Sequence, residues 1–201
     1  MDVQAALPFR SIAGPVALPR NARPAVSPAK ETDPALSVMT DFTTAAMFSI
    51  NHQVQIDQAL EYMKAVGVKL LFVLNDDGLL SGLITTTDIL GEKPMRYLHS
   101  VDASRTAAAR GNVLVRHVMS PLADWMVLDY PLVQRAQISQ IVATFKSAGM
   151  RHLVVTETGP SGTAVRGVIS ATRVEQALGK PLNIVRRANT FAEIEHAVIH
   201  T

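Results

Sequence analysis

An internal repeat is the feature that most constrains this chain. Val38-Met39-Thr40 has a counterpart in Val118-Met119-Ser120, and the same succession of patterns follows each tripeptide. A stripe of apolar residues at helical spacing comes first, then a glycine, a short apolar run, a turn and a second apolar run. Stacked repeats bury their apolar faces against one another. The chain is therefore expected to fold as two copies of one α/β unit.

The spacing of apolar residues places a helix and a hairpin in each copy. In the first copy the helical stripe is Ile56, Ala59, Leu60 and Met63, followed by Gly67 and the run 70–74. In the second copy it is Ile138, Ile141, Val142 and Phe145, followed by Gly149 and the run 153–155. Each glycine can close its helix in the left-handed conformation. The turn at 75–78 has the longer counterpart 158–162, so we expect the extra residues of copy two in that hairpin loop.

We expect the order β-α-β-β-α in each copy, with the two units packed around a pseudo-twofold axis. One copy alone is too small to be comfortably stable, so packing of the two buries what each leaves exposed. The expected division is a Pro-rich N-terminal arm at 1–35, a first unit at 36–99, a linker at 100–112, a second unit at 113–179, and a C-terminal tail with a short helix at 180–201.

Both ends of the chain offer contacts outside the repeat. The arm either adheres loosely to the module or drapes its apolar residues over a second subunit. In the tail, Thr190 and Glu193 form a capping-box pattern that begins an amphipathic helix. We expect this helix to pack on the module or on a second subunit.

Composition argues against several classes of protein. The absence of cysteine excludes disulfides, thiolate nucleophiles and cysteine-based zinc sites. The net charge is only +2, the basic residues are scattered and aromatic residues make up 5%, which argues against a nucleic-acid partner. The sequence holds no apolar run of about 18 residues and its start lacks the pattern of a secretory signal, so we expect no membrane association and a cytoplasmic location.

One segment of the first copy resembles a known family. Gly82-Leu83-Ile84-Thr85-Thr86-Thr87-Asp88-Ile89-Leu90 is similar to the signature of cystathionine-β-synthase-type (CBS) domains, Gly-x-hydrophobic-Thr/Ser-x-x-Asp-hydrophobic. The repeat unit around it also resembles that family in length and in the order of its elements, from about residue 36 to residue 179. The resemblance implies a tandem CBS pair, or Bateman module, that binds an adenine nucleotide such as AMP, ADP, ATP or S-adenosylmethionine as a regulatory ligand.

The signature places Thr85 and Asp88 at the point where a strand gives way to a helix. The hydroxyl of Thr85 can contact a phosphate or cap the helix, and Asp88 can accept hydrogen bonds from ribose hydroxyls. The resemblance implies these two contacts, and it implies that Ala46 and Ile84 line the pocket for the base. Thr85 and Asp88 also fit a capping box, a role compatible with ligand binding.

The second copy departs from the signature, because Ser170-Ala171-Thr172-Arg173 stands where the first copy has Thr85-Thr86-Thr87-Asp88. Arg173 cannot accept a hydrogen bond, although it could pair with a phosphate. We therefore expect one competent nucleoside site per chain, with Ser170 as the alcohol of the altered copy.

Three basic residues lie where each helix leads into its strand. Lys69 in the first copy and Arg151 and His152 in the second are candidates for phosphate contact near a central cleft. The alternative is that they are solvated charges at the strand ends.

The remaining motifs do not support catalysis. The sequence has no Gly-x-Ser-x-Gly elbow and no phosphate-binding glycine loop, so we expect no enzyme activity and no required cofactor. His196 and His200 have a metal-binding spacing beside Glu193, but their place near the end of the chain favours solvation, and no metal is expected. Trp125 is expected on the first strand of copy two, in the core or at an interface. Met119, Met126 and Met150 are interpreted as core residues.

Two functions remain open at this stage. In one, the protein senses an adenine nucleotide and signals to an effector protein that the sequence does not identify. In the other, it is a ligand-free structural or interaction module. The family resemblance implies a homodimer in both cases.

Overall fold

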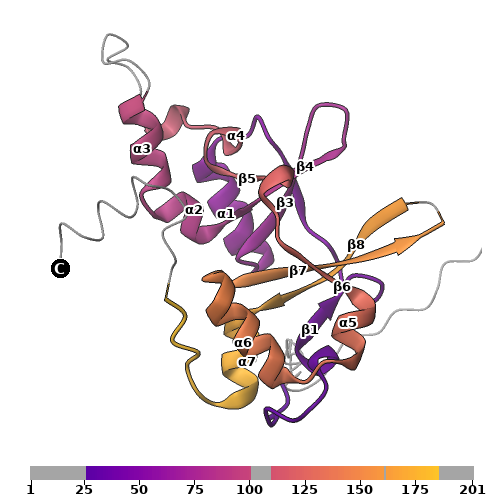
Figure 1. Ribbon diagram of the computed structural model, residues 1–201. Helices are drawn as coiled ribbons and strands as arrows, with labels where there is room; N and C mark the ends of the chain where they lie inside the picture. Colours follow the sequence, from indigo (N-terminus) through magenta and orange to yellow (C-terminus); the bar gives the residue numbers. More distant parts are fainter. Residues whose placement is uncertain (1–25, 101–109, 161, 186–201) are drawn as a thin grey trace, which may run out of the picture.

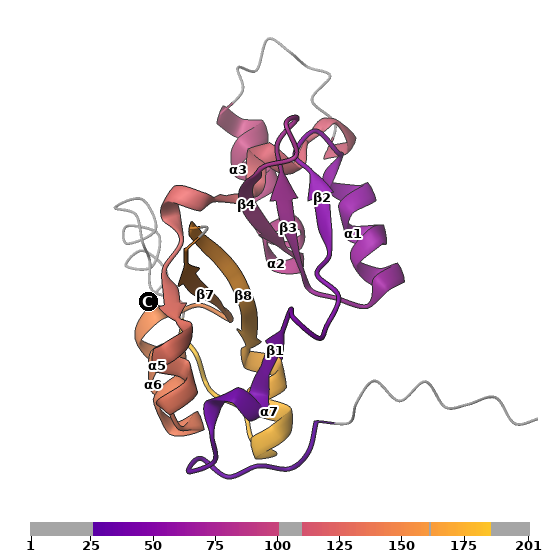
Figure 2. The same ribbon diagram turned by 90° about the vertical axis from the view of Figure 1, so that its right-hand side faces the viewer.

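The computed structural model describes residues 26–100, 110–160 and 162–185. They form two four-stranded sheets with helices packed on them, which confirms the expected α/β architecture. In Figures 1 and 2 one unit lies above the other. No helix in these ranges is long and apolar enough to cross a membrane.

The upper unit contains the sheet β2-β3-β4-β5. Its strands are β2 (Ser49–Asn51), β3 (Leu70–Leu74), β4 (Leu80–Thr85) and β5 (Ser120–Pro121). Its helices are α1 (Ile56–Val66), α2 (Thr86–Leu90), α3 (Lys93–Ser100) and α4 (Val115–Val118), with a 3-10 turn η2 (Arg110–Asn112).

The lower unit contains the sheet β1-β8-β7-β6. Its strands are β1 (Met39–Asp41), β8 (Gly162–Ser170), β7 (His152–Gly159) and β6 (Val127–Asp129). Its helices are α5 (Tyr130–Arg135), α6 (Ile138–Ala148) and α7 (Ala171–Leu178), with the 3-10 turn η1 (Ala35–Val38) before β1. A further 3-10 turn, η3 (Leu122–Asp124), connects β5 to β6 and contacts β4 of the upper unit.

The two units exchange their first strands. β1 begins the first copy but pairs antiparallel with β8 of the second, while β5 begins the second copy and pairs antiparallel with β4 of the first. The next short strand of each copy remains in the sheet of its own copy. β2 pairs parallel with β3, and β6 pairs parallel with β7. Each copy therefore has one strand more than the expected β-α-β-β-α order. The exchange also extends to the cores: Val38 packs in the lower unit, and Val115 and Val118 pack in the upper one.

A glycine makes room for each exchanged strand. A Cβ atom on Gly167 would stand 2.5 Å from the carbonyl oxygen of Thr40 in β1. On Gly82 it would stand 2.6 Å from the carbonyl oxygen of Ser120 in β5. Both separations are far below van der Waals contact and both partners are backbone atoms. The glycine at the start of the family-like signature is thus required by the crossing strand, once in each copy.

The helical stripes lie where the spacing predicts them. Ile56, Ala59 and Met63 of α1 are buried in the upper core. Ile138, Ile141, Val142 and Phe145 of α6 are buried in the lower core. The glycine after each helix is left-handed, with φ of 71° at Gly67 and 66° at Gly149. These predictions are confirmed.

The second hairpin differs from the expectation of a long loop. β7 and β8 continue their pairing out to Gly159 and Gly162, and Thr158 faces Thr163 with their hydroxyl oxygens 2.9 Å apart. The extra residues of copy two therefore lengthen the two strands. Thr, Val and Glu side chains tolerate an extended strand, and a pattern of turn residues at the tip does not reveal how far pairing reaches toward it.

The last part of the expected N-terminal arm lies against the lower unit. The Ala29 N–H donates to the carbonyl of Ala177 in α7, and Ile138 N–H donates to the carbonyl of Asp33. Lys180 forms a 2.7 Å ion pair with Glu31. Residues 26–34 are thus part of the folded module. The tail residues Thr190, Glu193, His196 and His200 lie outside the described residues.

Arg166 of β8 fixes the exchanged strand β1 by charge. Its guanidinium donates two hydrogen bonds of 3.0 Å to the carboxylate of Asp41 and one of 2.6 Å to Glu157. The same group lies 4.1 Å from the ring centre of Tyr130, a cation–π distance. These hydrogen bonds from Arg166 hold the pKa of Asp41 well below its usual range. This pair of hydrogen bonds between Arg166 and Asp41 lies at the end of β1, next to Thr40.

A Gly167→Ala substitution should destabilise the module because the new methyl group must push β1 off β8. We expect the free energy of unfolding to fall by about 1–3 kcal/mol, the usual cost of overpacking. Urea unfolding followed by circular dichroism measures it. The matched control is Gly159→Ala, where the added Cβ meets nothing within 4 Å. Equal losses in both variants would contradict the close-approach explanation.

Candidate functional site

A cavity of about 760 Å³ lies between the two units. Its walls come from β1 and the segment that follows it, from the loop between α1 and β3, and from the facing ends of β7, β8 and α7. Both copies of the repeat therefore contribute to one cavity. The exchange of β1 is what brings Thr40 and Phe42 of the first copy next to Ser170 of the second.

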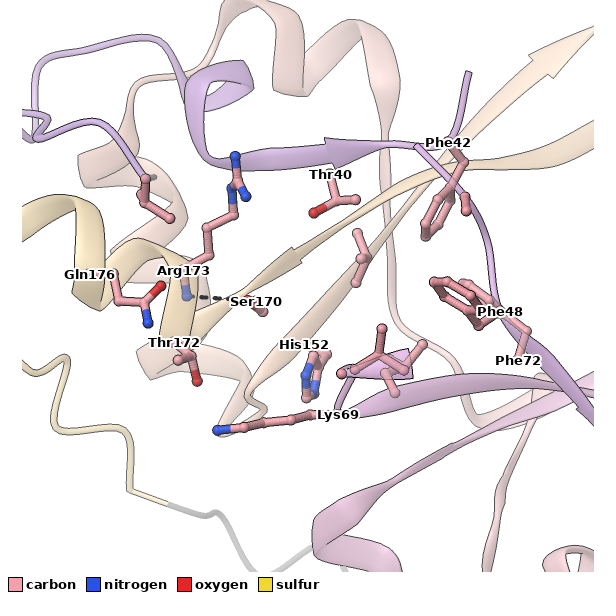
Figure 3. A pocket seen from close by; sticks show the side chains of 16 residues that line it. Thr40, Phe42, Phe48, Lys69, Phe72, His152, Ser170, Thr172, Arg173 and Gln176 are labelled. Atoms are coloured by element: carbon pink, nitrogen blue, oxygen red, sulfur yellow. Dashed lines mark hydrogen bonds between the residues drawn. The ribbon is translucent and has the colours of Figure 1, made fainter. Parts of the chain in front are cut away.

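One end of the cavity is aromatic. Figure 3 shows Phe42, Phe48 and Phe72 together at this end. Phe42 and Phe72 meet edge to face, with ring centres 5.6 Å apart. Phe72 also packs against Trp125, with ring centres 6.0 Å apart. Ala46, Val68 and Leu70 add further apolar surface. Such a wall suits a flat apolar ring system.

The other end is polar and cationic. Lys69, Thr172, Arg173 and Gln176 gather there, with His152 and Ser170 between them and the aromatic rings (Figure 3). The hydroxyl of Ser170 accepts a 3.2 Å hydrogen bond from the Arg173 N–H and so caps α7. The lining contains Lys69 and Arg173 but no carboxylate. This end is therefore suited to an anionic group.

Arg173 has an unusual environment for a cation. It occupies the third position of α7, where the positive end of the helix dipole disfavours it. Its Nε atom is buried, and no hydrogen-bond partner for it exists in the part of the chain that the structure describes. A buried donor without a partner costs free energy, so this side chain is held in place at a cost to stability.

His152 is uncharged in this cavity at neutral pH. Burial, assisted by the neighbouring positive charge of Arg151, lowers the pKa of His152 to about 4, with Asp88 opposing and Lys69 reinforcing the shift. A neutral imidazole carries one N–H donor and one acceptor nitrogen. His152 can therefore hydrogen-bond a ligand in either sense.

Thr85 and Asp88 lie outside this cavity lining. They form a complete capping box at the start of α2, as the sequence allowed. One oxygen of Asp88 accepts from the N–H and the hydroxyl of Thr85, at 2.8 and 2.7 Å, and the other is 2.7 Å from the ammonium of Lys93. Asp88 is only 8% exposed. Its carboxylate is thus fully engaged within the protein.

The eight residues predicted to bind a ligand therefore separate into groups. Ala46, Lys69, His152 and Ser170 line the cavity together. Ala46 thus shares a cavity with Ser170 of the second copy, whereas Thr85 lies outside this lining.

Two further positions differ from expectation. Ile84 is completely buried in the upper core and lies outside this cavity lining, so its contact with a base stays a prediction. Arg151 turns toward α7 and pairs with Glu175 at 2.7 Å, which leaves it outside the cavity lining. Ile84 lies on the face of β4 that packs on the core, since neighbouring residues of a strand point to opposite faces.

Other parts of the site escaped the sequence analysis. Thr40 and Phe42 belong to the cavity because β1 crosses to the other sheet, and nothing in their local pattern signals this. Phe48 directly precedes β2 and packs against the upper core. Trp125 lies between η3 and β6 and not on a strand, although it does pack on Phe72. Met126 is 63% exposed, so its interpretation as a core residue is wrong. Met119 packs against the upper core as expected.

Comparisons with known proteins now place the fold. Residues 38–94 match the model of the CBS domain family. An uncharacterized conserved protein from Pyrococcus horikoshii superposes with a TM-score of 0.50 at 16% identity, covering 81% of this chain and 99% of that one. The first copy of the repeat therefore contains a CBS domain, and the chain as a whole has the fold of a tandem CBS pair. The second copy carries the same elements and the reciprocal strand exchange.

Two other solved structures illustrate the range of similar proteins. MJ1225 from Methanocaldococcus jannaschii has a TM-score of 0.50 at 19% identity, over 71% of this chain and 49% of that chain. CBSX2, solved in complex with AMP, has a TM-score of 0.46 at 20% identity, over 70% of this chain and 91% of that chain. No curated protein matches the sequence.

An Arg173→Asp substitution should stabilise the ligand-free CBS pair. The new carboxylate can close a capping box with Ser170 as Asp88 does with Thr85, and it replaces a cation at the positive end of α7. We expect a gain of about 1 kcal/mol, seen as a rise in Tm of roughly 2–4 °C. Arg173→Gln is the control that removes the charge without supplying the cap. A lower Tm for the aspartate variant would contradict this account of Arg173.

His152 should make the CBS pair less stable in mild acid. Between its unfolded pKa near 6.5 and its folded pKa of about 4, the unfolded chain binds a proton that the folded chain does not. Stability therefore falls as pH is lowered through this window. Relative to His152→Gln, the wild type should lose on the order of 2–3 kcal/mol more between pH 7 and pH 4, measured by urea unfolding. Parallel curves for the two proteins would show that His152 titrates normally.

Proposed function

We propose that this CBS pair is a regulatory module that binds an adenine nucleotide in the cavity between its units. The observation that carries the proposal is the polarity of the cavity, with three phenylalanine rings at one end and Lys69 and Arg173 at the other. A purine ring with a phosphorylated sugar has the same polarity. CBSX2 was solved with AMP, but the support for this chain comes from its own residues.

The proposed contacts follow from the lining. The base lies against Phe42 and Phe48 near Ala46, and the phosphate lies toward Lys69. Ser170 and neutral His152 supply hydrogen bonds between these ends. A ligand here touches both units, so its binding energy favours one relative orientation of the two copies, and a partner protein can respond to that orientation. Binding and signalling of this kind require no catalytic group and no further cofactor.

Thr85 and Asp88 remain a second proposed nucleoside site. A ribose that binds Asp88 competes with Thr85 and Lys93 for the carboxylate oxygens. This competition lowers the affinity expected at this site. We therefore assign the tighter site to the cavity.

AMP, ADP, ATP and S-adenosylmethionine should be compared by thermal shift. A ligand present at a hundredfold excess over its Kd stabilises the folded state by about 2.7 kcal/mol. For a chain of this size we expect a rise in Tm of roughly 5–10 °C with at least one of them. Lys69→Gln should reduce that shift, whereas Asp88→Asn should retain it even if its own Tm is lower.

The matched control for Lys69 is Lys146→Gln, an exposed lysine on α6 outside the cavity lining. If no adenine ligand at millimolar concentration shifts the Tm of the wild type, the nucleotide proposal is wrong. If the shift is lost in Asp88→Asn but kept in Lys69→Gln, the nucleotide binds at the other site.

The alternative function is a ligand-free assembly module. The observation in its favour is that the Asp88 carboxylate is already satisfied within the chain. Exposed apolar side chains at Leu122, Met126 and Leu132 offer a surface for a second protein. We propose a homodimer that contacts an effector protein in both functions. Light scattering on the purified chain tests it, and a monomeric mass across the micromolar range would exclude the dimer.

A further inference from the structure

The two copies of the repeat carry residues of opposite charge at one equivalent position. Asp88 is the third residue of α2 after the capping alcohol Thr85, and Arg173 is the third residue of α7 after the capping alcohol Ser170. The carboxylate of Asp88 accepts hydrogen bonds from the N–H and the hydroxyl of Thr85, the residue that caps its helix. Arg173 uses only its backbone N–H for capping, so its side chain is left to line the cavity.

The described protein supplies no counter-charge for Arg173. Its Nε lacks a partner among the described residues, and the cavity lining there contains no aspartate or glutamate. The nearest acidic residue of its own helix, Glu175, already binds Arg151 at 2.7 Å and accepts from the Leu182 N–H at 3.2 Å. A cation at the start of a helix adds a further unfavourable interaction. All of these conflicts would be relieved by one bound anion.

The geometry of the cavity calls for two separate anionic groups. Lys69 belongs to the upper unit and Arg173 to the lower one, and Figure 3 shows them on either side of His152. A guanidinium has only donors in a planar fork, which suits phosphate and does not suit the hydroxyl pair of an unmodified ribose. In dinucleotide-binding folds the same distinction holds, because an acidic residue binds the free ribose hydroxyls and an arginine accommodates a phosphate on them.

We infer that the cavity selects a purine nucleotide with phosphates at two different positions of its sugar, one for Lys69 and one for Arg173. The aromatic end holds the base, and the hydroxyl of Ser170 donates to the phosphate bound by Arg173. This inference rests on the proposed function and narrows its ligand class. It also gives a reason for keeping an arginine where an aspartate would make the ligand-free protein more stable.

Titration calorimetry with three probes tests the selection. The probes are AMP, adenosine 3′,5′-bisphosphate, and ADP, which carries both phosphates in one chain and so controls for charge alone. We expect the bisphosphate to bind at least about tenfold more tightly than AMP and than ADP, as one charge-assisted pair allows. Arg173→Gln should abolish this preference, so that the bisphosphate, AMP and ADP bind this variant with affinities within about twofold of one another.

The control variant is Arg135→Gln, an exposed arginine on α5 that removes the same charge outside the cavity. It should keep the preference for the bisphosphate. Arg173→Asp is the second variant, and it should favour AMP over the bisphosphate. Ligand-free thermal unfolding of each variant shows that the module is folded.

The outcomes separate the two proposals. If AMP binds as tightly as the bisphosphate, or if the preference survives in Arg173→Gln, the inference about two phosphates is wrong while the nucleotide function stands. If ADP binds as tightly as the bisphosphate, the site responds only to the total charge of the ligand, and the inference is again wrong. If none of the three probes binds to the wild type, the proposed function fails and this inference fails with it.

Discussion

The exchange of edge strands between the two units is the constraint on which the rest of this structure depends. β1 completes the lower sheet and β5 completes the upper one, and each passes over a glycine that leaves no space for a side chain. The exchange buries the start of each copy in the core of the other unit. It also places Thr40 and Phe42 of the first copy in one cavity with Ser170 of the second. Without it there would be two small sheets and no shared cavity.

The two copies share one fold, but they differ at the residue that decides the chemistry of the cavity. The capping alcohols Thr85 and Ser170 occupy equivalent places, and the same helix geometry follows both. The third residue of the helix then decides what each copy can do. Asp88 completes the capping box of α2, and its carboxylate bonds within the protein. Arg173 completes no capping box, lies at the positive end of the α7 dipole and places a positive charge in the cavity. A local cost of this kind, with no structural compensation in the described residues, is what a ligand site is expected to show.

The sequence predicts the periodic parts of this molecule well. The stripes of α1 and α6, the glycines that end them and the α/β repeat all follow from spacing, because burial of one helix face imposes its period directly. It predicts one strand before the first long helix of each copy where the structure has two, since strands of two or three residues are too short to show alternation. The strand exchange is a long-range pairing with no local signal.

The candidate site was predictable only in part for the same reason. Lys69, His152 and Ser170 follow from the repeat, because equivalent strand ends must face each other across a twofold axis. Ala46 lines the cavity as well, whereas Ile84 is buried in the upper core and Arg151 pairs with Glu175, so both lie outside this lining. The residue with most consequence, Arg173, was visible in the sequence as a departure from the signature. Its unpartnered state in a cavity needed the structure.

The most direct test of the central claim, that the ligand lies in the cavity between the units, is a ¹⁵N-resolved NMR titration of the full chain with AMP. The account predicts that the largest amide shift changes fall on Thr40, Lys69 and Ser170, which come from both copies and meet only in this cavity. Changes confined to the helix start at Thr85 and Asp88, or spread over one unit alone, would contradict it.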